Sequence, residues 1–322
     1  DTSSFIFRAY YSNPPIHRSR DGMPIGAVMG FCNMLNKLVL NKMIRERHTT
    51  TTNTALPIVI QCLDAPGPSF RKALYTEYKA NRPPVPMDLL PQFAMINQAC
   101  QAYGMIQIQS IGNEADDVIA SLATKGMHDE NLNIVILSSD KDLMQLVTKY
   151  TTNENEIQNN TSSGNVKNGS GGIIQMMDPM TNKLWTYDRV CEKWDVETTS
   201  LLGDVLALAG DAADNIPGVP GIGPKIASQL LKEYGSLDNL LSNLDNIPQQ
   251  KRREKLIEHK DMAILSRELV ELKRDLNWTE LQIFHPNMDD STASMDANDN
   301  ISSSSNNNNN ADTTTVPTSV TM

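Results

Sequence analysis

The chain has 322 residues, a formal charge of −10 and 39% hydrophobic residues, enough for one large domain or two modest ones. No stretch approaches the roughly 18 consecutive apolar residues of a membrane-spanning helix, and the four scattered cysteines fit neither a zinc site nor a disulfide framework. The composition therefore excludes a membrane-spanning protein and a disulfide-rich secreted domain, and we expect free thiols in an intracellular protein.

The first half of the chain alternates strand and helix patterns. "LPIVIQCLD" (56–64) and "NIVILSSDKD" (133–142) are short β-branched runs, and the helical patterns cover 25–47, 86–103 and 114–125. Continuous apolar runs predict strands buried on both faces, as in a parallel sheet, and the alternation predicts an α/β fold. "DTSSFIFRAYY" begins where a strand should end, so if Asp1 closes a first strand, that strand lies upstream of the sequence.

Two polar segments interrupt these patterns. "TTNENEIQNNTSSGNVKNGSGG" (151–172) is predicted to be an inserted loop, and the Ser-, Asn- and Thr-rich residues 286–322 a disordered tail, because neither can bury enough apolar surface. Between them the pattern becomes all helix, at 197–209, 224–233, 236–243, 250–258 and 261–271. We therefore predict an α/β domain over 1–190 and a helical region over 191–285.

Acidic residues gather where strands end or helices begin. Each one alone is ordinary, since acids favour the first turn of a helix and aspartate favours turns. In an open α/β sheet, however, ligands bind beyond the carboxyl ends of the strands, so these side chains are predicted to converge. The nine carboxylates belong to Asp1, Asp64, Glu114, Asp116, Asp117, Asp140, Asp142, Asp211 and Asp214.

Nine carboxylates facing one site would repel one another unless cations neutralised them. Oxygen ligands suit Mg²⁺ or Mn²⁺. Two such ions about 4 Å apart would activate a water and stabilise the leaving oxygen of a phosphodiester. Setting aside these nine charges and the five aspartates of 287–322 leaves +4 for the rest, so the net charge does not exclude a nucleic-acid partner.

Two segments carry features of nucleic-acid binding. Residues 71–82 hold four basic side chains against Glu77, although an ordinary solvated basic helix would look the same, and Tyr75 and Tyr78 could equally be packing residues. In "NIPGVPGIGPKIA" (215–227), a glycine-rich turn opens onto a helix that begins at Pro224, which forms an anion site to which Lys225 adds charge. This predicts a helix–hairpin–helix over 205–235 that grips a phosphate backbone without reading bases.

"GDAADNIPGVPGIGPKIASQLLKEYGSLDNLL" closely resembles the helix–three-turn–helix of the 5′–3′ exonuclease (flap endonuclease) domain of bacterial DNA polymerase I. The resemblance runs from Asp1 to about Asn277 and includes "DTSSFIFRAYY", "CLDAPGPSFRKALYTEYKANRPPVP", "NEADDVIASLA" and "SSDKDLMQLV". It implies a PIN/flap-nuclease-like fold, with a mostly parallel central sheet flanked by helices, a helical arch at about 68–100 and the helical hairpin region. Asp1, which matches the family's first metal-binding aspartate, is the first residue of the sequence. The insertion at 151–172 is longer than the usual connection of the family.

The resemblance also implies roles for individual residues. One ion would be held by Asp1, Asp64, Glu114 and Asp116 with Asp117 alongside, and the second by Asp140, Asp142, Asp211 and Asp214. Lys79, Arg82 and Arg8 would contact the reacting phosphates, Arg71, Lys72 and Tyr78 would contact the 5′ strand under the arch, and Gly218, Val219, Gly221, Ile222, Gly223 and Lys225 would hold the duplex. The hairpin carbonyls of 218–223 would also match a potassium site of the family.

The function that the resemblance implies is a structure-specific 5′–3′ exonuclease or 5′-flap endonuclease in DNA replication and repair. It would act as a monomer on DNA flaps and RNA–DNA primer junctions by a two-metal-ion mechanism. Two alternatives stay open: a catalytically inactive DNA-junction-binding protein on the same scaffold, and a related metal-dependent ribonuclease. Asn-rich inserts around a bacterial-type enzyme suggest a DNA-containing compartment of a eukaryote, a plastid or a mitochondrion.

Overall fold

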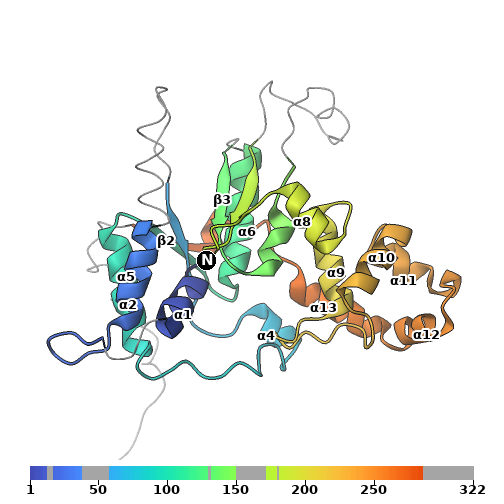
Figure 1. Cartoon of the computed structure of the whole chain (residues 1–322), viewed down its shortest axis with the longest axis horizontal. Coiled ribbons are helices and arrows are strands. Elements are labelled where there is room, and N and C mark those ends of the chain that lie inside the picture. Colours follow the sequence, from blue (N-terminus) through green and yellow to red (C-terminus); the bar gives the residue numbers. More distant parts are fainter. Residues whose placement is uncertain (13–16, 38–57, 130–131, 150–171, 180, 286–322) are drawn as a thin grey trace, which may run out of the picture. The chain divides into compact units, whose positions relative to one another are not determined.

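The computed structural model describes the chain except for residues 13–16, 38–57, 130–131, 150–171, 180 and 286–322. The predicted tail therefore lies outside the described residues, as does the predicted insertion apart from Gly172. Residues 1–286 form one compact unit by their internal contacts, and Figure 1 shows the order of its elements.

The strands form two three-stranded sheets, β1-β2-β6 and β3-β4-β5. In each sheet the first pair is parallel and the second pair antiparallel. The α/β class is confirmed, but the described strands form two mixed sheets rather than one mostly parallel sheet. The strands are β1 (Ile60–Cys62), β2 (Ile106–Ser110), β3 (Ile134–Leu137), β4 (Ile174–Met177), β5 (Leu184–Trp185) and β6 (Leu281–Phe284).

Helices of the first half surround a small core of their own. α1 begins directly after Asp1, and its residues Phe5 and Ile6 pack with Phe31 of α2 and Ile96 of α5. The rings of Phe5 and Phe31 meet edge to face, with centroids 6.2 Å apart. The helices that line this core are α1 (Thr2–Ser12), α2 (Gly26–Leu35) and α5 (Leu90–Ala102). The other helices of the first half are α4 (Phe70–Leu74), α6 (Ala115–Asp129) and the 3₁₀ helix η2 (Lys141–Leu146).

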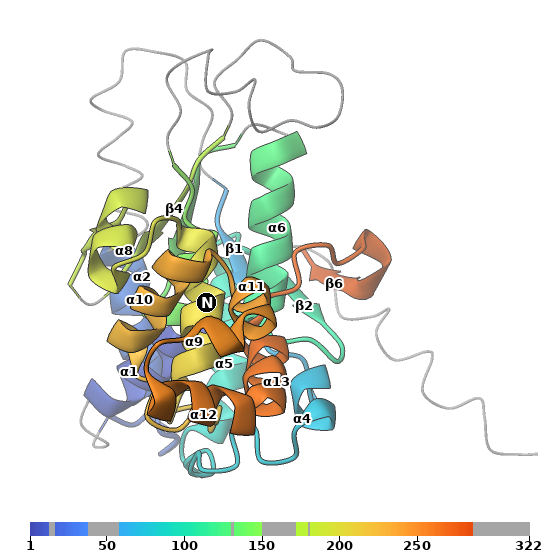
Figure 2. The ribbon, with the colours of Figure 1, turned by 90° about the vertical axis from the view of Figure 1, so that its right-hand side faces the viewer.

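The second half is helical where the sequence predicts it, and Figure 2 shows these helices from the side. Pro224 opens α10 at its first position, where a missing amide hydrogen is tolerated, and Gly235 ends it with a positive φ of 81°. The helices are α8 (Tyr187–Trp194), α9 (Leu202–Ala209), α10 (Pro224–Tyr234), α11 (Leu237–Ser242), α12 (Gln250–Glu258) and α13 (Lys260–Val270), with the 3₁₀ turn η3 (Thr199–Leu201) before α9.

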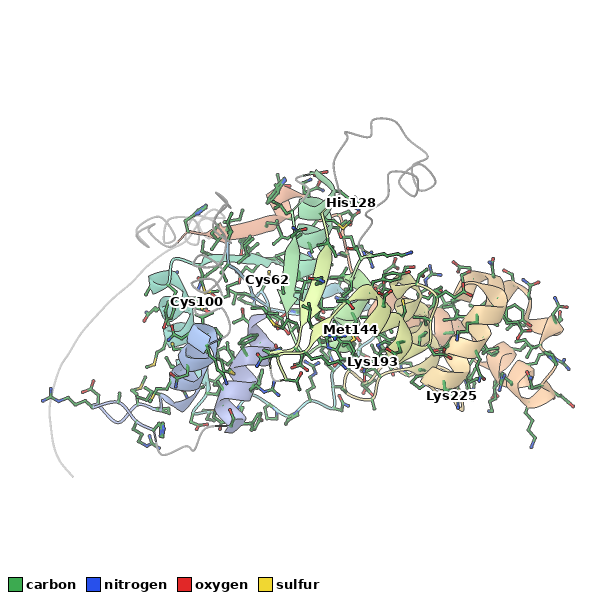
Figure 3. All side chains as sticks on the ribbon, turned by 45° about the horizontal axis from the view of Figure 1, so that its top comes forward. Cys62, Cys100, His128, Met144, Lys193 and Lys225 are labelled. Atoms are coloured by element: carbon green, nitrogen blue, oxygen red, sulfur yellow. The ribbon has the colours of Figure 1, made fainter. Side chains whose placement is uncertain are left out.

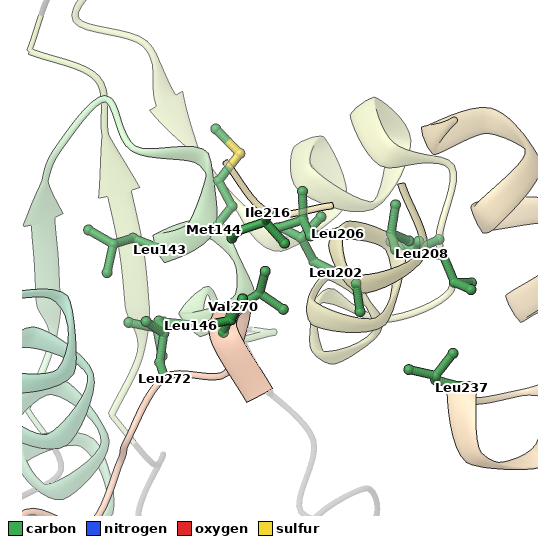
Figure 4. Packing of buried hydrophobic residues seen from close by; sticks show 14 of the residues in the cluster. Leu143, Met144, Leu146, Leu202, Leu206, Leu208, Ile216, Leu237, Val270 and Leu272 are labelled. Atoms are coloured by element: carbon green, nitrogen blue, oxygen red, sulfur yellow. The ribbon is translucent and has the colours of Figure 1, made fainter. Parts of the chain in front are cut away.

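One large core joins the two halves. Leu143 and Leu146 of η2 pack into the same cluster as Leu202 and Leu206 of α9 and Val270 at the end of α13 (Figure 4). Each of these side chains is at most 2% exposed, so each contributes about 1.5–3 kcal/mol of burial to fixing η2 in place. This packing matters for the site because η2 begins directly after Asp140 and carries Asp142.

The predicted division near residue 190 does not coincide with a gap in the packing of the described residues. The core crosses it, and β6, at 281–284 of the predicted helical region, pairs antiparallel with β2 of the first half. A strand there was not predicted. The division into two domains stays a prediction.

Each of the four cysteines is free, as the sequence predicts. In the part of the chain that the structure describes, no helix has both the length and the apolar character needed to cross a membrane.

Candidate metal centre and nucleic-acid interface

Three carboxylates that the sequence singled out converge in the structure. Asp142, Asp211 and Asp214 each offer one oxygen, and these oxygens all lie within 4.8 Å of one another. Asp142 comes from the first turn of η2, while Asp211 and Asp214 belong to the loop after α9.

Asp142 Oδ1 is buried and has no hydrogen-bond partner among the described residues. A buried oxygen without a donor costs roughly 1–3 kcal/mol, and more when it is charged, so its presence calls for an explanation. Carboxylate oxygens are the ligands that Mg²⁺ and Mn²⁺ prefer. The donor set and the unpartnered oxygen therefore fit a divalent cation.

The electrostatics of the group agree with this fit. Burial raises the pKa of Asp142 to about 8, the carboxylates of Asp140, Asp211 and Asp214 raise it as well, and Lys141 opposes the shift. Burial likewise raises the pKa of Asp140, although the Asp142 backbone N–H donates to Asp140 Oδ1 at 2.9 Å and works against the shift. The acids lie too close together to ionise in full without a cation.

Asp116 links this group to the remaining acids. Burial raises the pKa of Asp116 well above its ordinary value, and repulsion from Asp140, Asp64 and Glu114 adds to the shift, while Lys79 opposes it. Asp116 thus senses the charges of acids on both sides of it, and we call the set from Asp64 and Glu114 through Asp116 and Asp140 to the three convergent carboxylates the acidic cluster.

The predicted first-ion ligands are not gathered in the same way. Asp1 Oδ2 accepts from the Ser138 hydroxyl at 2.6 Å, and Asp64 accepts from the Ala115 amide at 2.9 Å and the Ser3 hydroxyl at 2.8 Å. Within the described ranges, these acids form no further group whose oxygens lie within 4.8 Å of one another. Their role as ligands of one ion stays a prediction.

Asp117 is a structural residue rather than a metal ligand. It is fully buried, its two oxygens accept from the Arg71 guanidinium at 2.7 and 2.8 Å, and the amides of Glu114 and Lys273 donate to it at 3.0 Å each. Four donors occupy the carboxylate, so its predicted metal role is wrong.

Arg71 is misassigned for the same reason. It is 2% exposed, and besides Asp117 its guanidinium donates to the carbonyls of Leu269 and Glu271 at 2.7 and 2.8 Å. A side chain held in this way cannot reach a DNA strand, so the predicted contact is wrong, and Arg71 instead ties α4 to the end of α13.

Tyr78 is also a packing residue. It is 4% exposed, and its hydroxyl donates to Glu114 Oε2 at 3.0 Å, so the predicted stacking on a base is contradicted. Lys72 is partly exposed, and its ammonium donates to the Tyr78 carbonyl at 3.0 Å. The predicted DNA contact of Lys72 stays a prediction.

Lys79 and Arg82 lie at the acidic cluster. Lys79 Nζ is 2.9 Å from Glu114 Oε2 and 3.8 Å from Asp214 Oδ2, and Arg82 pairs with Asp214. The structure shows no ion pair between Arg8 of α1 and the described acids. Two predicted phosphate-contacting cations thus stand beside the predicted metal ligands, and the third does not.

Backbone contacts join the 75–82 segment to the loop that carries Asp211 and Asp214. The Lys79 amide donates to the Asp214 carbonyl at 2.9 Å, the Asn81 side chain to the Ala212 carbonyl at 2.6 Å, and the Asn215 side chain to the Glu77 carbonyl at 2.7 Å. Sequence reasoning missed both asparagines, because neither sits in a pattern that marks a contact across the fold.

Lys141 and Ser138 were also missed. Lys141 Nζ lies 2.8 Å from Asp211 Oδ2, and the fully buried Ser138 donates to Asp1 Oδ2 while accepting from the Asp140 amide at 3.0 Å. Both stand inside "SSDKD", directly beside predicted ligands, and this position is the signal that could have identified them.

The hairpin that follows the acids depends on two glycines. Gly210 and Gly218 have φ of 73° and 60°, and a Cβ on Gly218 would lie 2.4 Å from the Gly210 nitrogen. This close backbone crossing lets Asp211 and Ile216 exchange two backbone hydrogen bonds of 2.9 and 2.8 Å, which fixes the loop between them.

The predicted duplex-contacting residues of the hairpin fall into two groups. Val219 and Ile222 are buried and anchor the turn, and Gly218 is buried at the crossing. Gly221, Gly223 and Lys225 are exposed, and the amides of both glycines donate to no acceptor among the described residues. Only the second group is free to receive a phosphate, and the predicted potassium site stays a prediction.

A cavity of about 680 Å³ lies elsewhere, between η2, α9 and the end of α13, with Phe70, Arg267 and Arg274 among its lining residues. None of the nine predicted metal ligands lines it. The candidate site is therefore the acidic cluster and not this cavity.

Comparison with known proteins identifies the family of the chain. The family model for the 5′-3′ exonuclease N-terminal resolvase-like domain matches residues 1–171, and that for the 5′-3′ exonuclease C-terminal SAM fold matches residues 198–291. Among solved structures, the T5 5′-exonuclease with bound zinc superposes with a TM-score of 0.58 at 19% identity, over 85% of this chain and 88% of that one. At this identity the likeness concerns the fold.

Curated relatives share more of the sequence. The chain is 44% identical over 276 residues to DNA polymerase I of Rhizobium leguminosarum, a match that covers 86% of this chain but 24% of that protein. It is 34% identical over 277 residues to the 5′-3′ exonuclease of Aquifex aeolicus, and there the match covers 86% of this chain and 81% of the relative. The two family matches together span most of the sequence, so the chain belongs to the 5′-3′ exonuclease family.

Proposed function

We propose that this protein is a divalent-metal-dependent nuclease that removes 5′ single-stranded flaps and RNA primers from duplex DNA, as a 5′–3′ exonuclease and flap endonuclease. The observation that supports this most strongly is the convergence of Asp142, Asp211 and Asp214 around an unpartnered carboxylate oxygen. The same loop continues into the glycine-rich turn that leads to α10. The proposed metal ligands and the groups proposed to bind the DNA backbone are therefore neighbours in the sequence.

Asp140, Asp142, Asp211 and Asp214 would hold one divalent ion, Mg²⁺ or Mn²⁺, and Asp1, Asp64, Glu114 and Asp116 a second. Bound ions would supply activation of the attacking water and stabilisation of the charge on the leaving oxygen.

The remaining roles fall to side chains of the chain itself. Lys79 forms an ion pair with Glu114, and Arg82 forms one with Asp214. If divalent ions bound these two acids, Lys79 and Arg82 would be placed to bind a substrate phosphate. The exposed Gly221 and Gly223 amides and Lys225 would bind the duplex backbone without contacting bases. In this division of labour, residues 1–190 supply most of the proposed metal ligands, and residues 191–285 add Asp211 and Asp214 and hold the duplex.

Several finer features belong to the same proposal. The substrate is a junction with a 5′ end rather than free RNA, because a hairpin that binds a backbone beside the acids suits a duplex. We further propose action as a monomer in replication and repair, within a DNA-containing compartment such as a plastid or mitochondrion, and a potassium ion at the carbonyls of 218–223.

Cleavage of matched substrates tests this function. A labelled 5′-flap DNA, a 3′-flap DNA of the same sequence and a single-stranded RNA are incubated with Mg²⁺, with Mn²⁺ and with EDTA. We expect short 5′ products from the 5′ flap only, and only with a divalent metal. Binding without cleavage would indicate the inactive junction binder, and preferential cleavage of the RNA would indicate a ribonuclease; either result contradicts the proposal.

A further inference from the structure

Two lysines and two tryptophans form a cluster outside the acidic site. Lys183 Nζ lies 3.9 Å from the ring centroid of Trp185, and Lys193 Nζ lies 4.6 Å from the same ring and 5.3 Å from that of Trp194. We call these four residues the Trp–Lys cluster. Both lysines are exposed, whereas Trp185 is buried, so the indole rings hold two exposed lysine side chains by cation–π contacts.

The Trp–Lys cluster lies between η2, which carries Asp142, and α10, which follows the hairpin. Lys193 Nζ and Trp194 Nε1 contact the sulfur of Met144 in η2, at 3.8 and 3.5 Å. On the other side, Ser228 of α10 donates to the Trp194 carbonyl at 2.7 Å. Figure 3 labels Met144, Lys193 and Lys225, which is exposed one turn before Ser228 on the same face of α10.

The Trp–Lys cluster therefore contacts η2 and α10, and a strand that ran over it from the hairpin to the acids would meet four lysines. These are Lys225 after the hairpin, Lys193 and Lys183 in the cluster, and Lys141, which pairs with Asp211. The position of the cluster follows from the contacts of α8, whose last two residues touch both η2 and α10.

The charges of the cluster have no ion-pair partner in the part of the chain that the structure describes. Neither Lys183 nor Lys193 has a carboxylate within 4.0 Å in the described ranges, unlike Lys141 or Lys232. Burial lowers the pKa of Lys193, and the ammonium groups of Lys183 and Lys141 lower it further, with Asp178 opposing more weakly. An anion bound here would relieve this repulsion.

A purely structural explanation accounts for part of the arrangement. Lys193 sits in the last turn of α8, where a cation is favoured by the helix dipole. Lys183 lies outside that helix, before β5, yet its ammonium is brought to the same ring. Two like charges placed against one aromatic ring are better explained by an anionic ligand.

We propose that Lys193 and Lys183 bind the phosphate backbone of the DNA between the hairpin and the metal centre. This proposal rests on the proposed nuclease function. It adds a third DNA-binding surface to the two already proposed, which are the hairpin and the pair Lys79 and Arg82. Its role is to position the strand, since the two lysines touch the backbone and not the reacting phosphate.

Salt-dependent binding tests the proposal. The assay measures the affinity for a 5′-flap DNA in Ca²⁺ over a range of salt concentrations. It compares the wild type with Lys183→Gln, Lys193→Gln and the double variant. Each phosphate contact contributes about 0.9 to the slope of log affinity against log salt on duplex DNA. We expect the double variant to lose about 1–2 units of slope and to bind roughly 5- to 20-fold more weakly at moderate salt.

Lys125→Gln is the matched control. Lys125 also lies over a tryptophan, 5.8 Å from the ring of Trp278, but pairs with Asp129 on α6, so its removal should leave affinity and slope unchanged. Lys193→Arg keeps the charge and should restore binding. Thermal unfolding of every variant separates loss of contact from loss of fold, and a variant that unfolds early is replaced by Lys193→Met.

The outcomes separate this surface from the function on which it rests. If the double variant binds with the affinity and the salt slope of the wild type, the proposed surface is overturned but the nuclease function is not. An equal loss in Lys125→Gln also overturns it, because the effect is then general to surface charge. Failure of the wild-type chain to bind flap DNA at all overturns the nuclease function and the surface together.

Discussion

At the scale of single residues, the site depends on buried and half-buried acids that lie beside one another. Asp142, Asp211 and Asp214 could be predicted from the sequence because their positions after a strand and before a hairpin place them at one edge of an α/β fold. Asp117 and Arg71 could not be assigned correctly. A first-turn acid and a basic helix look the same whether they face solvent or pair in the core, and the carbonyls that hold Arg71 lie near residue 270.

The raised pKa of Asp142 predicts how the metal-free protein responds to pH. A carboxyl group whose pKa rises from 3.8 to about 8 on folding takes up a proton, so its stabilising contribution is present at low pH and is lost as pH rises toward 8. In EDTA, the melting temperature should fall between pH 5 and 8, over the window between these two pKa values. The measurement is thermal unfolding across that window.

Divalent metal and Asp142→Asn provide the controls for this prediction. Bound metal stabilises the ionised acids, so Mg²⁺ or Mn²⁺ should raise the melting temperature more at pH 8 than at pH 5. Asp142→Asn removes the titrating group and should flatten the pH dependence. A metal-free melting temperature that rises steadily with pH would contradict the account of the cluster.

The Arg71–Asp117 pair gives a second prediction at this scale. Arg71→Ala leaves the Asp117 charge buried without a partner and should lower the free energy of unfolding by about 3–5 kcal/mol. The double variant Arg71→Ala/Asp117→Ala should cost less than the sum of the single changes. Urea unfolding measures all three. A stable Arg71→Ala protein that binds DNA weakly would instead support a strand-contacting role for Arg71.

At the scale of elements, the runs that are strongly apolar or strongly periodic were predictable. The helices from 199 to 270 follow the predicted ranges closely, since their apolar faces repeat with helical spacing. β2 was missed because "IQIQS" alternates with glutamine, and Gln107 is in fact buried, donating to Gln61 of β1 at 2.7 Å. β6 was missed because its partner lies about 170 residues earlier in the chain.

The two sheets also differ from the predicted burial. β1 and β3 each pair with one described strand, and Ile60 and Val135 are 40% and 43% exposed. Apolar runs alone predict burial on both faces, but exposure depends on which neighbours a strand has, and that information is not local.

The hairpin offers a prediction at the scale of an element. Gly218→Ala places a Cβ 2.4 Å from the Gly210 nitrogen at a φ of 60°, so the crossing must open, at a cost of roughly 2–4 kcal/mol. Because this crossing fixes the loop of Asp211 and Asp214, metal affinity should fall as well. Calorimetric titration with Mn²⁺ and thermal unfolding measure the two effects.

Gly223→Ala is the matched control for the hairpin. It has no left-handed φ, and a Cβ there meets no atom within 4 Å, so stability should change by less than about 1 kcal/mol. Metal affinity should stay the same. If Gly218→Ala proved as stable as Gly223→Ala, the backbone crossing would not be what holds the loop.

At the scale of the whole molecule, one core supports both the acids and the hairpin. Leu143 and Leu146 anchor η2 in the same cluster that contains Val219 and Ile222 of the hairpin. The shared core thereby holds the proposed metal ligands and the proposed backbone-binding groups in one packed unit. The overall charge of −10 is misleading on this scale, because a large part of it lies in the acidic cluster and in residues 287–322.

The central claim is that Asp142, Asp211 and Asp214 hold a divalent ion that is needed to cut a 5′ flap. Its most direct test is single-turnover cleavage of a 5′-flap DNA over a Mg²⁺ titration, by the wild-type chain and by Asp142→Ala. We predict metal-dependent cleavage by the wild type and a rate at least about 100-fold lower for Asp142→Ala at saturating DNA. Equal rates for the two proteins, or cleavage that persists in EDTA, would contradict it.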